Sequence, residues 1–216
     1  MRRPKPRAVE DDATMSVMLE NELRPTPGER LTYGDLLRLP DDHLRHELIN
    51  GEHYVSPAPG TVHQRVVLNV ARLLAAHCDE HPLGEIFVAP YAVVFDDVNK
   101  VEPDVLYISH ARAALLQTER DLVGAPELIV EVSSPTTRSY DVTVKRALYE
   151  RSGVSEYWFV DATWSTLTIY RRAVGAESFA APIVLDEPDA EVSTPLLPAL
   201  HEPLRTFFKS PRGSLG

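Results

Sequence analysis

A carboxylate inside an apolar strand is the feature of this sequence that most needs a chemical explanation. Leu128 to Val132 form a short apolar run between two prolines, which is typical of a strand buried on both faces. Glu131 lies within this run. A buried carboxylate without a partner costs several kcal/mol, so Glu131 needs a compensating cation, a metal ion or a proton.

Two other groups could share a site with Glu131. Residues 101–108 predict a second strand, which opens on Pro103-Asp104. Residues 139–152 have the pattern of a helix that carries Lys145 on a four-residue stripe with Asp141 and Tyr149. Two carboxylates and a lysine beside a sheet are the smallest set of catalytic groups that a metal-dependent phosphodiesterase needs.

The chemistry of phosphodiester hydrolysis explains why these residue types are needed. A divalent cation is placed on the scissile phosphate, together with an attacking water of lowered pKa. Magnesium prefers oxygen ligands and keeps several waters, so Asp104, Glu131 and the backbone carbonyl of Val132 could hold it. Lys145 would orient the water or stabilise the developing negative charge. An acid in an apolar strand can instead pair with a core arginine, and spacing alone leaves both alternatives open.

The sequence before these segments predicts a hairpin and a long helix. Asn50-Gly51 between two strand-like runs is a strong hairpin signal, and Glu47 lies on the first strand. Taken alone, Glu47 is best interpreted as facing solvent. We expect Thr61 to cap a helix that reaches about His81 and buries Val62. His63, in its first turn, is interpreted as a surface residue that could also face a phosphate.

The remaining pattern alternates between strands and helices. We expect strands over 84–95, 103–108, 127–133, 156–161 and 165–172, helices over 32–39, 110–117 and 139–152, and weaker elements from 182 to 208. This order predicts an α/β fold in which a mixed β-sheet is flanked by helices in three layers. It also predicts one domain over residues 29–208, a disordered extension over 1–28 and a frayed tail over 209–216.

Composition narrows the class of protein. The net charge of −10 argues against a protein that coats nucleic acid by electrostatics alone, but acidic residues that hold divalent cations are compatible with a nuclease. A single cysteine, Cys78, excludes an intramolecular disulfide and a cysteine-built zinc site. Motifs for zinc proteases, phosphate-binding loops and serine hydrolases are missing. The sequence has neither a membrane span nor a secretory signal, so we expect a cytoplasmic protein.

Several short motifs follow one another in an order that can be compared with known families. They are Glu47-Leu-Ile-Asn-Gly-Glu52, Pro57-Ala-Pro-Gly-Thr-Val-His63, Pro103-Asp-Val105, Glu131-Val-Ser-Ser-Pro135 and the stretch from Lys145 through Tyr149 to Asp161. Together they closely resemble the Uma-type family of putative restriction endonucleases, a bacterial branch of the PD-(D/E)-x-K nuclease superfamily. The resemblance covers roughly residues 31 to 208.

The resemblance implies a restriction-endonuclease-like fold and a role for each candidate residue. It implies that Asp104 and Glu131 are metal ligands, that Lys145 is the catalytic lysine and that Glu47 is an accessory acid near the metal. One position departs from the superfamily pattern. The lysine that normally follows two residues after the second acid is replaced here by Ser133, and the family places the lysine on the next helix.

Two functions of different classes remain. The leading one is a DNA endonuclease that depends on magnesium, or on manganese, and acts as a homodimer that hides apolar segments such as Leu196–Leu200. The alternative is a catalytically inactive nuclease-fold protein that binds protein partners. The two differ in whether Glu47, Asp104, Glu131 and Lys145 converge. Without a metal, we expect mutual repulsion among Asp104, Glu131 and Glu47 in a partly desolvated cleft to raise their pKa values.

Overall fold

The computed structural model describes residues 29–40, 42, 44–56, 58–116, 121–133 and 138–210. The extension expected over residues 1–28 and the chain from residue 211 onward lie outside the described residues. The helices are α2 (Tyr33–Leu36), α3 (Thr61–Glu80), η1 (His110–Leu115), α4 (Arg138–Tyr140), η2 (Asp141–Lys145), α5 (Arg146–Arg151) and η3 (Leu204–Thr206). The strands are β1 (Arg45–Ile49), β2 (Glu52–Ser56), β3 (Gly84–Val88), β4 (Ala92–Asp96), β5 (Asn99–Val101), β6 (Val105–Ser109), β7 (Asp121–Val123), β8 (Leu128–Ser133), β9 (Glu156–Asp161), β10 (Thr166–Arg171), β11 (Ile183–Leu185), β12 (Glu191–Thr194) and β13 (Leu197–Pro203).

The central sheet has six strands in the order β11-β10-β9-β8-β6-β3. β8 pairs in parallel with β9 and antiparallel with β6, so the sheet is mixed. Each residue of β8 is buried, which confirms the prediction of a strand covered on both faces. Its successive side chains point to opposite faces, so Val130 and Ile129 belong to different core clusters.

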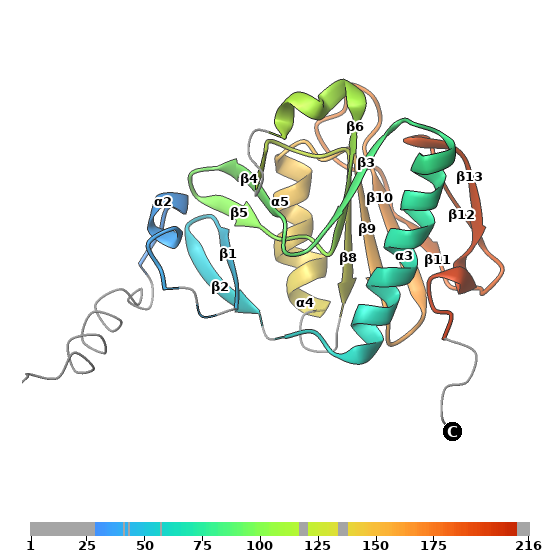
Figure 1. The fold of residues 1–216 in the computed structure, drawn as a ribbon, viewed down its shortest axis with the longest axis horizontal. Helices are drawn as coiled ribbons and strands as arrows, with labels where there is room; N and C mark the ends of the chain where they lie inside the picture. Colours follow the sequence, from blue (N-terminus) through green and yellow to red (C-terminus); the bar gives the residue numbers. More distant parts are fainter. Residues whose placement is uncertain are drawn as a thin grey trace, which may run out of the picture.

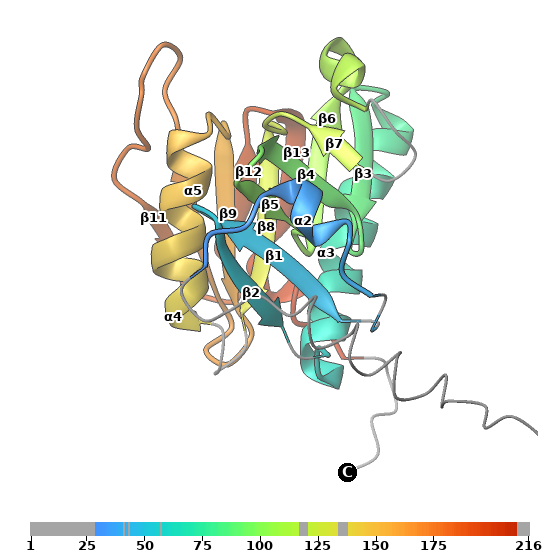
Figure 2. The ribbon, with the colours of Figure 1, turned by 90° about the vertical axis from the view of Figure 1, so that its left-hand side faces the viewer.

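Three layers form around this sheet. One core cluster joins α3 and the β12–β13 hairpin to one face of the sheet, and Figure 1 shows both on the same side. The other cluster joins α5 and a second sheet, in the order β2-β1-β5-β4-β7, to the opposite face. Figure 2 shows this second sheet in front of β8, with α5 beside it. The predicted three-layer arrangement of a mixed sheet flanked by helices is therefore confirmed.

The hairpin before the site has the conformation that its turn residues predict. β1 and β2 pair antiparallel from Arg45 with Ser56 to Ile49 with Glu52. Asn50 and Gly51 have φ of 54° and 77°, which is the left-handed region that this two-residue turn requires. β1 also pairs with β5, so it is an inner strand of the second sheet rather than an exposed edge strand.

Two strand predictions are wrong in detail. The single strand expected over 84–95 is divided into β3 and β4, which belong to different sheets. Pro90 lies between them and has no backbone N–H to donate to a ladder. The strand expected over 101–108 is divided in the same way, because Val101 ends β5 and β6 begins only at Val105 in the other sheet.

The N-cap residue of α3 lies one position earlier in the sequence than expected. Gly60 is the N-cap, and Thr61 is the first helical residue and makes no cap. Val62 is 56% exposed rather than buried, because it lies in the first turn before the helix reaches the sheet. The buried stripe consists of Val66, Val70, Leu74, His77 and Cys78. No helix in the described part of the chain has the length and apolarity that a membrane span requires.

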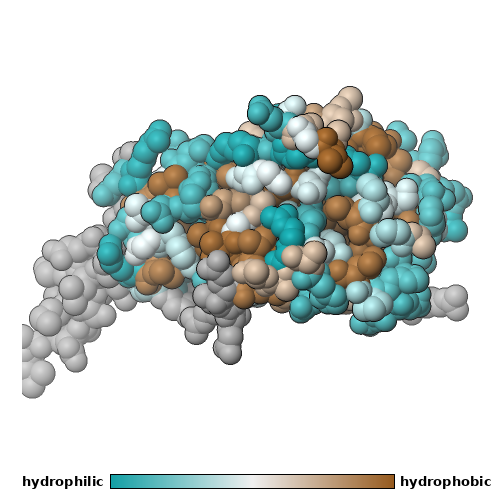
Figure 3. All heavy atoms as spheres, turned by 90° about the horizontal axis from the view of Figure 1, so that it is seen from above, coloured by the Kyte–Doolittle hydropathy of each residue, from teal (hydrophilic) through white to brown (hydrophobic). Residues whose placement is uncertain are grey.

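The apolar segment near the C-terminus packs inside the chain. Leu197 is fully buried and Leu200 is 4% exposed, and both contact the core beneath α3. The expectation that this segment is exposed is therefore wrong, because β13 pairs with β12 and covers the sheet with it. On the face seen in Figure 3, apolar side chains form separate patches divided by hydrophilic ones.

The contact between β3 and β6 leads to a stability prediction. A Cβ on Gly84 would lie 2.1 Å from the carbonyl oxygen of Ile108 and 2.7 Å from the Cα of Ser109. We expect Gly84→Ala to lower the free energy of unfolding by about 1–3 kcal/mol or more, because backbone atoms must move. Urea unfolding measures the change. Gly34→Ala is the matched control, since its nearest contact would be an ordinary 3.6 Å. Equal stability of the two variants would contradict this packing.

Candidate active site

The pairing of β6 with β8 brings the two predicted metal ligands to the same end of the ladder. The ladder pairs Leu106 with Ile129 and Val105 with Val130. Asp104 comes directly before β6, and Glu131 is the residue of β8 after Val130. The two carboxyl groups are close enough that the charge of Asp104 raises the pKa of Glu131.

The β6 ladder stops where the site begins. β8 continues to Ser133, and in place of a strand partner the side chain of Asp104 accepts a hydrogen bond from the Val132 N–H at 2.9 Å. In an extended strand the N–H and C=O of one residue point to the same side. The Val132 carbonyl therefore faces the Asp104 side of β8.

Glu131 receives two hydrogen bonds from the neighbouring helix. Lys145 Nζ and Tyr149 Oη both donate to Glu131 Oε1, at 2.9 and 2.5 Å. All three side chains are buried. The partner of Glu131 is therefore the lysine expected from the family resemblance and not a core arginine.

A π-helical turn precedes Lys145. The Arg146 N–H donates to the carbonyl of Asp141, five residues back, and the Tyr157 hydroxyl donates to the same carbonyl at 3.2 Å. Such widened turns are frequent at functional sites, because they re-aim side chains within a helix. The helix then returns to α-helical geometry in α5 and ends before Gly153, whose φ of 88° is the left-handed conformation that glycine commonly supplies after a C-cap.

Glu47 reaches the same lysine from the second sheet. Its Oε1 accepts hydrogen bonds from Lys145 Nζ at 2.9 Å and from the Glu102 N–H at 3.0 Å. The side chain is completely buried, so the solvent-facing interpretation is wrong. The reason is that β1 is an inner strand whose inward face packs toward α5. Its Oε2 is buried and has no hydrogen-bond partner among the described residues.

Two side chains that were not among the predicted site residues hold Asp104. Arg45 Nη2 lies 3.1 Å from Asp104 Oδ1, and His63 Nε2 lies 3.0 Å from Oδ2. Arg45 is two residues before Glu47, and period-two alternation along β1 could have placed both on one face. His63 is 13% exposed in its side chain, so its interpretation as a surface residue is wrong.

The two carboxyl groups titrate in opposite directions. Burial raises the pKa of Glu131, Lys145 lowers it, and the nearby charges of Asp104, Asp141 and Glu47 raise it, to about 8 in all. Burial also works to raise the pKa of Asp104, but His63, Arg45 and the Val132 N–H outweigh it and lower that pKa. The expected rise is therefore confirmed for Glu131 and wrong for Asp104.

Lys145 stays charged in this setting. Burial works to lower its pKa, but the charges of Glu131, Glu47 and Asp141 raise it well above the ordinary value for lysine. Three acidic side chains thus face one ammonium group in a buried region. This excess of acidic groups over ammonium groups, together with the Glu47 Oε2 that has no hydrogen-bond partner among the described residues, would favour a divalent cation.

The oxygen donors at this site suit magnesium better than a metal ion that needs three or more side-chain ligands. As the side chains lie, no three His, Cys, Asp or Glu residues among those described group closely enough to enclose a metal ion. Magnesium needs only one or two carboxylates and keeps several waters. Asp104, Glu131 and the Val132 carbonyl meet that lower requirement.

Comparison with known proteins identifies the family and the fold of this chain. A family model described as "Putative restriction endonuclease" and named Uma2 matches residues 33–205. A solved structure, described as a putative nuclease belonging to DUF820 from Anabaena variabilis, is 22% identical with a TM-score of 0.71 and covers 82% of this chain and 97% of that one. At this identity the likeness establishes the fold, and the expected restriction-endonuclease-like architecture is confirmed. No curated protein matches the chain at a significant level.

The raised pKa of Glu131 leads to a prediction about stability and pH. The folded protein keeps the proton up to about pH 8, whereas the unfolded chain releases it near the ordinary value of 4.5. The folded state therefore binds more protons between these values, and the free energy of unfolding falls as the pH rises through this window, by the order of a few kcal/mol. Asp104 acts with the opposite sign but below this window, because its pKa is lowered.

Urea unfolding between pH 5 and 8, without divalent cations, measures this dependence. We expect Glu131→Gln to flatten it, because the variant has no proton to lose at this position. Glu85→Gln changes an exposed carboxylate on β3 and is the matched control, which should keep the dependence of the parent protein. An unchanged slope in Glu131→Gln would mean that Glu131 is ionised throughout.

Proposed function

Because this chain belongs to the Uma2 family of putative restriction endonucleases, we propose that it is a metal-dependent endonuclease that hydrolyses phosphodiester bonds in DNA. The observation that supports this most directly is the convergence of Glu131 and Glu47 on the buried amine of Lys145, with Asp104 bonded to the N–H of Val132 beside Glu131. These groups come from β1, β8, η2 and the segment before β6. A network of this kind, with more acids than its one lysine can neutralise, suits a cation-dependent reaction.

The proposed ligands of the cation are Asp104, Glu131 and the carbonyl of Val132. Magnesium is the first candidate, with manganese as an alternative, because both prefer oxygen ligands. When bound, the cation would supply positive charge to the scissile phosphate and lower the pKa of an attacking water. Arg45 and His63 hold the Asp104 carboxylate in position from the side of β1 and α3.

The role of Lys145 in this proposal is that of a charged group. Its raised pKa makes it a poor base at neutral pH, because it does not release its proton there. A protonated amine can instead stabilise the negative charge that develops on the phosphate. Glu47 acts as a positioning residue, since it holds the amine from the side opposite Glu131. Tyr149 positions Glu131 in the same way.

The homodimer expected from the sequence stays a prediction. Its original basis, an exposed apolar segment at Leu196–Leu200, is removed by the burial of Leu197 and Leu200 in the core. Two copies would still provide one active site for each strand of a duplex. Sedimentation at micromolar concentration, with and without DNA, would test it.

Plasmid cleavage tests the proposed activity. We expect nicking or linearisation with magnesium and none with EDTA. Asp104→Asn and Glu131→Gln should abolish it, because an amide oxygen is a poorer ligand than a carboxylate. Glu85→Gln should cleave like the parent protein. If the folded parent protein cleaves no DNA with magnesium or manganese, the chain is the inactive, partner-binding member that is the alternative function.

Lys145 allows a test that separates catalysis from stability. Without metal, Lys145→Ala leaves the carboxylates of Glu47 and Glu131 buried without their cation, and we expect a loss of about 3–5 kcal/mol in the free energy of unfolding. Magnesium should recover part of this loss, because a bound divalent cation replaces the missing charge. Turnover should fall about 10²–10³-fold even at saturating magnesium.

Thermal melts with and without magnesium, beside single-turnover cleavage, give both quantities for Lys145→Ala. Lys209→Ala removes an exposed lysine near the C-terminus and serves as the control. A variant that loses stability equally with and without magnesium would indicate that Lys145 only holds the fold together.

A further inference from the structure

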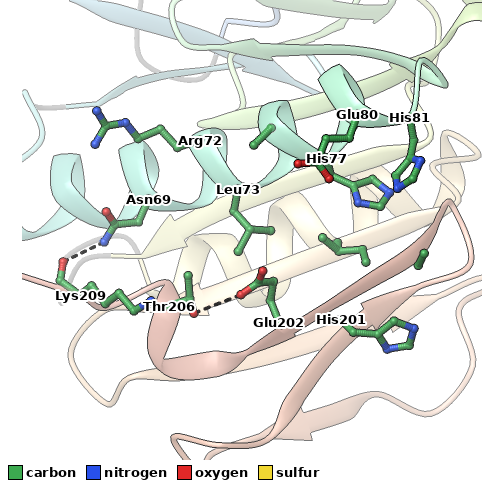
Figure 4. A pocket seen from close by; sticks show the side chains of 13 residues that line it. Asn69, Arg72, Leu73, His77, Glu80, His81, His201, Glu202, Thr206 and Lys209 are labelled. Atoms are coloured by element: carbon green, nitrogen blue, oxygen red, sulfur yellow. Dashed lines mark hydrogen bonds between the residues drawn. The ribbon is translucent and has the colours of Figure 1, made fainter.

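A pocket lined by three histidines lies at the other end of α3. A pocket of about 520 Å³ opens between the C-terminal half of this helix and β13. Its lining includes His77, His81, His201 and Glu80. Figure 4 shows the rings of His77 and His81 next to each other at one end of the pocket, while Arg72 and Lys209 lie at the other end.

One of these histidines is buried without a partner. His77 is 8% exposed, and its Nε2 has no hydrogen-bond partner among the described residues. A buried ring nitrogen that makes no hydrogen bond is costly, and such a group calls for an explanation such as a bound ion. The His81 imidazole lies beside that of His77, with ring centroids 4.7 Å apart, so one ion can contact both rings.

The backbone fixes the spacing of this pair. His77 and His81 are four residues apart, so they lie on the same side of the helix. The His81 N–H donates to the His77 carbonyl at 2.9 Å, which closes the last turn between them. The end of a helix carries partial negative charge, and this favours a cation there. Glu80 adds a carboxylate to the same pocket.

We propose that His77 and His81 form a two-histidine chelate for a divalent transition-metal ion of the Zn²⁺, Co²⁺ or Ni²⁺ class. Imidazole nitrogens prefer these ions to magnesium, which takes oxygen ligands. The described part of the chain groups no third His, Cys, Asp or Glu with this pair, so water completes the coordination sphere. The site therefore binds reversibly and selects borderline metals over hard ones.

This site is separate from the proposed nuclease centre. His63, which contacts Asp104, and His77 are fourteen residues apart on one continuous helix, a distance of ~21 Å along its axis. A metal at His77 and His81 therefore cannot take part in the chemistry at Asp104. The direct effect of the bound metal ion is to stabilise the last turn of α3.

Titration with Zn²⁺ followed by isothermal calorimetry tests the proposal. The parent protein should bind one ion that magnesium does not displace, and zinc should raise the melting temperature. His81→Gln changes an exposed side chain, so the fold should be kept, while the zinc affinity should fall about tenfold or more. The zinc-induced rise in melting temperature should disappear with it.

Two controls distinguish this site from other zinc ligands. His110→Gln removes an exposed histidine on η1 and should bind zinc like the parent protein. Glu131→Gln should also keep the site, because it alters only the proposed magnesium centre. Equal zinc binding by the parent protein and His81→Gln would overturn the proposal, as would a loss that appears only in Glu131→Gln. Because no cleavage is measured, the result is independent of the proposed nuclease activity.

Discussion

The structure depends on one buried amine shared by two carboxylates. Lys145 donates to Glu47 and to Glu131, and all three side chains are removed from water. The charges of the acids keep the lysine protonated in spite of its burial, and the lysine opposes the rise in the pKa of Glu131 that burial causes. The interaction joins β1, β8 and the helix that covers them, so it connects both sheets of the fold.

This connection explains several features that are otherwise separate. β8 is a fully buried strand, but its ladder with β6 stops one residue before Glu131, and Asp104 takes over the next hydrogen bond. The helix above it contains a π turn before Lys145. Regular strand pairing and a regular helix are both interrupted where the polar groups converge. Deviations of this kind at one place are characteristic of a functional site.

The charge distribution gives the site its chemical character. His63 and Arg45 lower the pKa of Asp104, whereas burial raises the pKa of Glu131 to about 8 because its ammonium partner Lys145 is shared with Glu47. The two acids of one site thus prefer different protonation states before a cation is present. A divalent cation would favour the ionised form of both. The overall net charge of −10 does not oppose this, because the local balance of charge decides what binds there.

The sequence alone predicted the main strands and helices and the burial of Glu131. β8 follows from an apolar run between prolines, the hairpin from Asn50-Gly51, and the helix that carries Lys145 from the pattern of residues 139–152. The burial of Glu131 follows from its place in that run. These features depend on backbone preferences and short-range periodicity, which neighbouring residues determine.

Only the tertiary structure decided which long-range partners the charged residues have. Glu47 looked exposed because the sequence does not show that β5 pairs with β1 and makes it an inner strand. Arg45 and His63 are separated from Asp104 by 59 and 41 residues, and nothing in their local pattern indicates that contact. The division of 84–95 into two sheets and the burial of Leu197 have the same cause. Pairing between distant strands depends on how the whole chain covers its apolar faces, and that is a property of the complete fold.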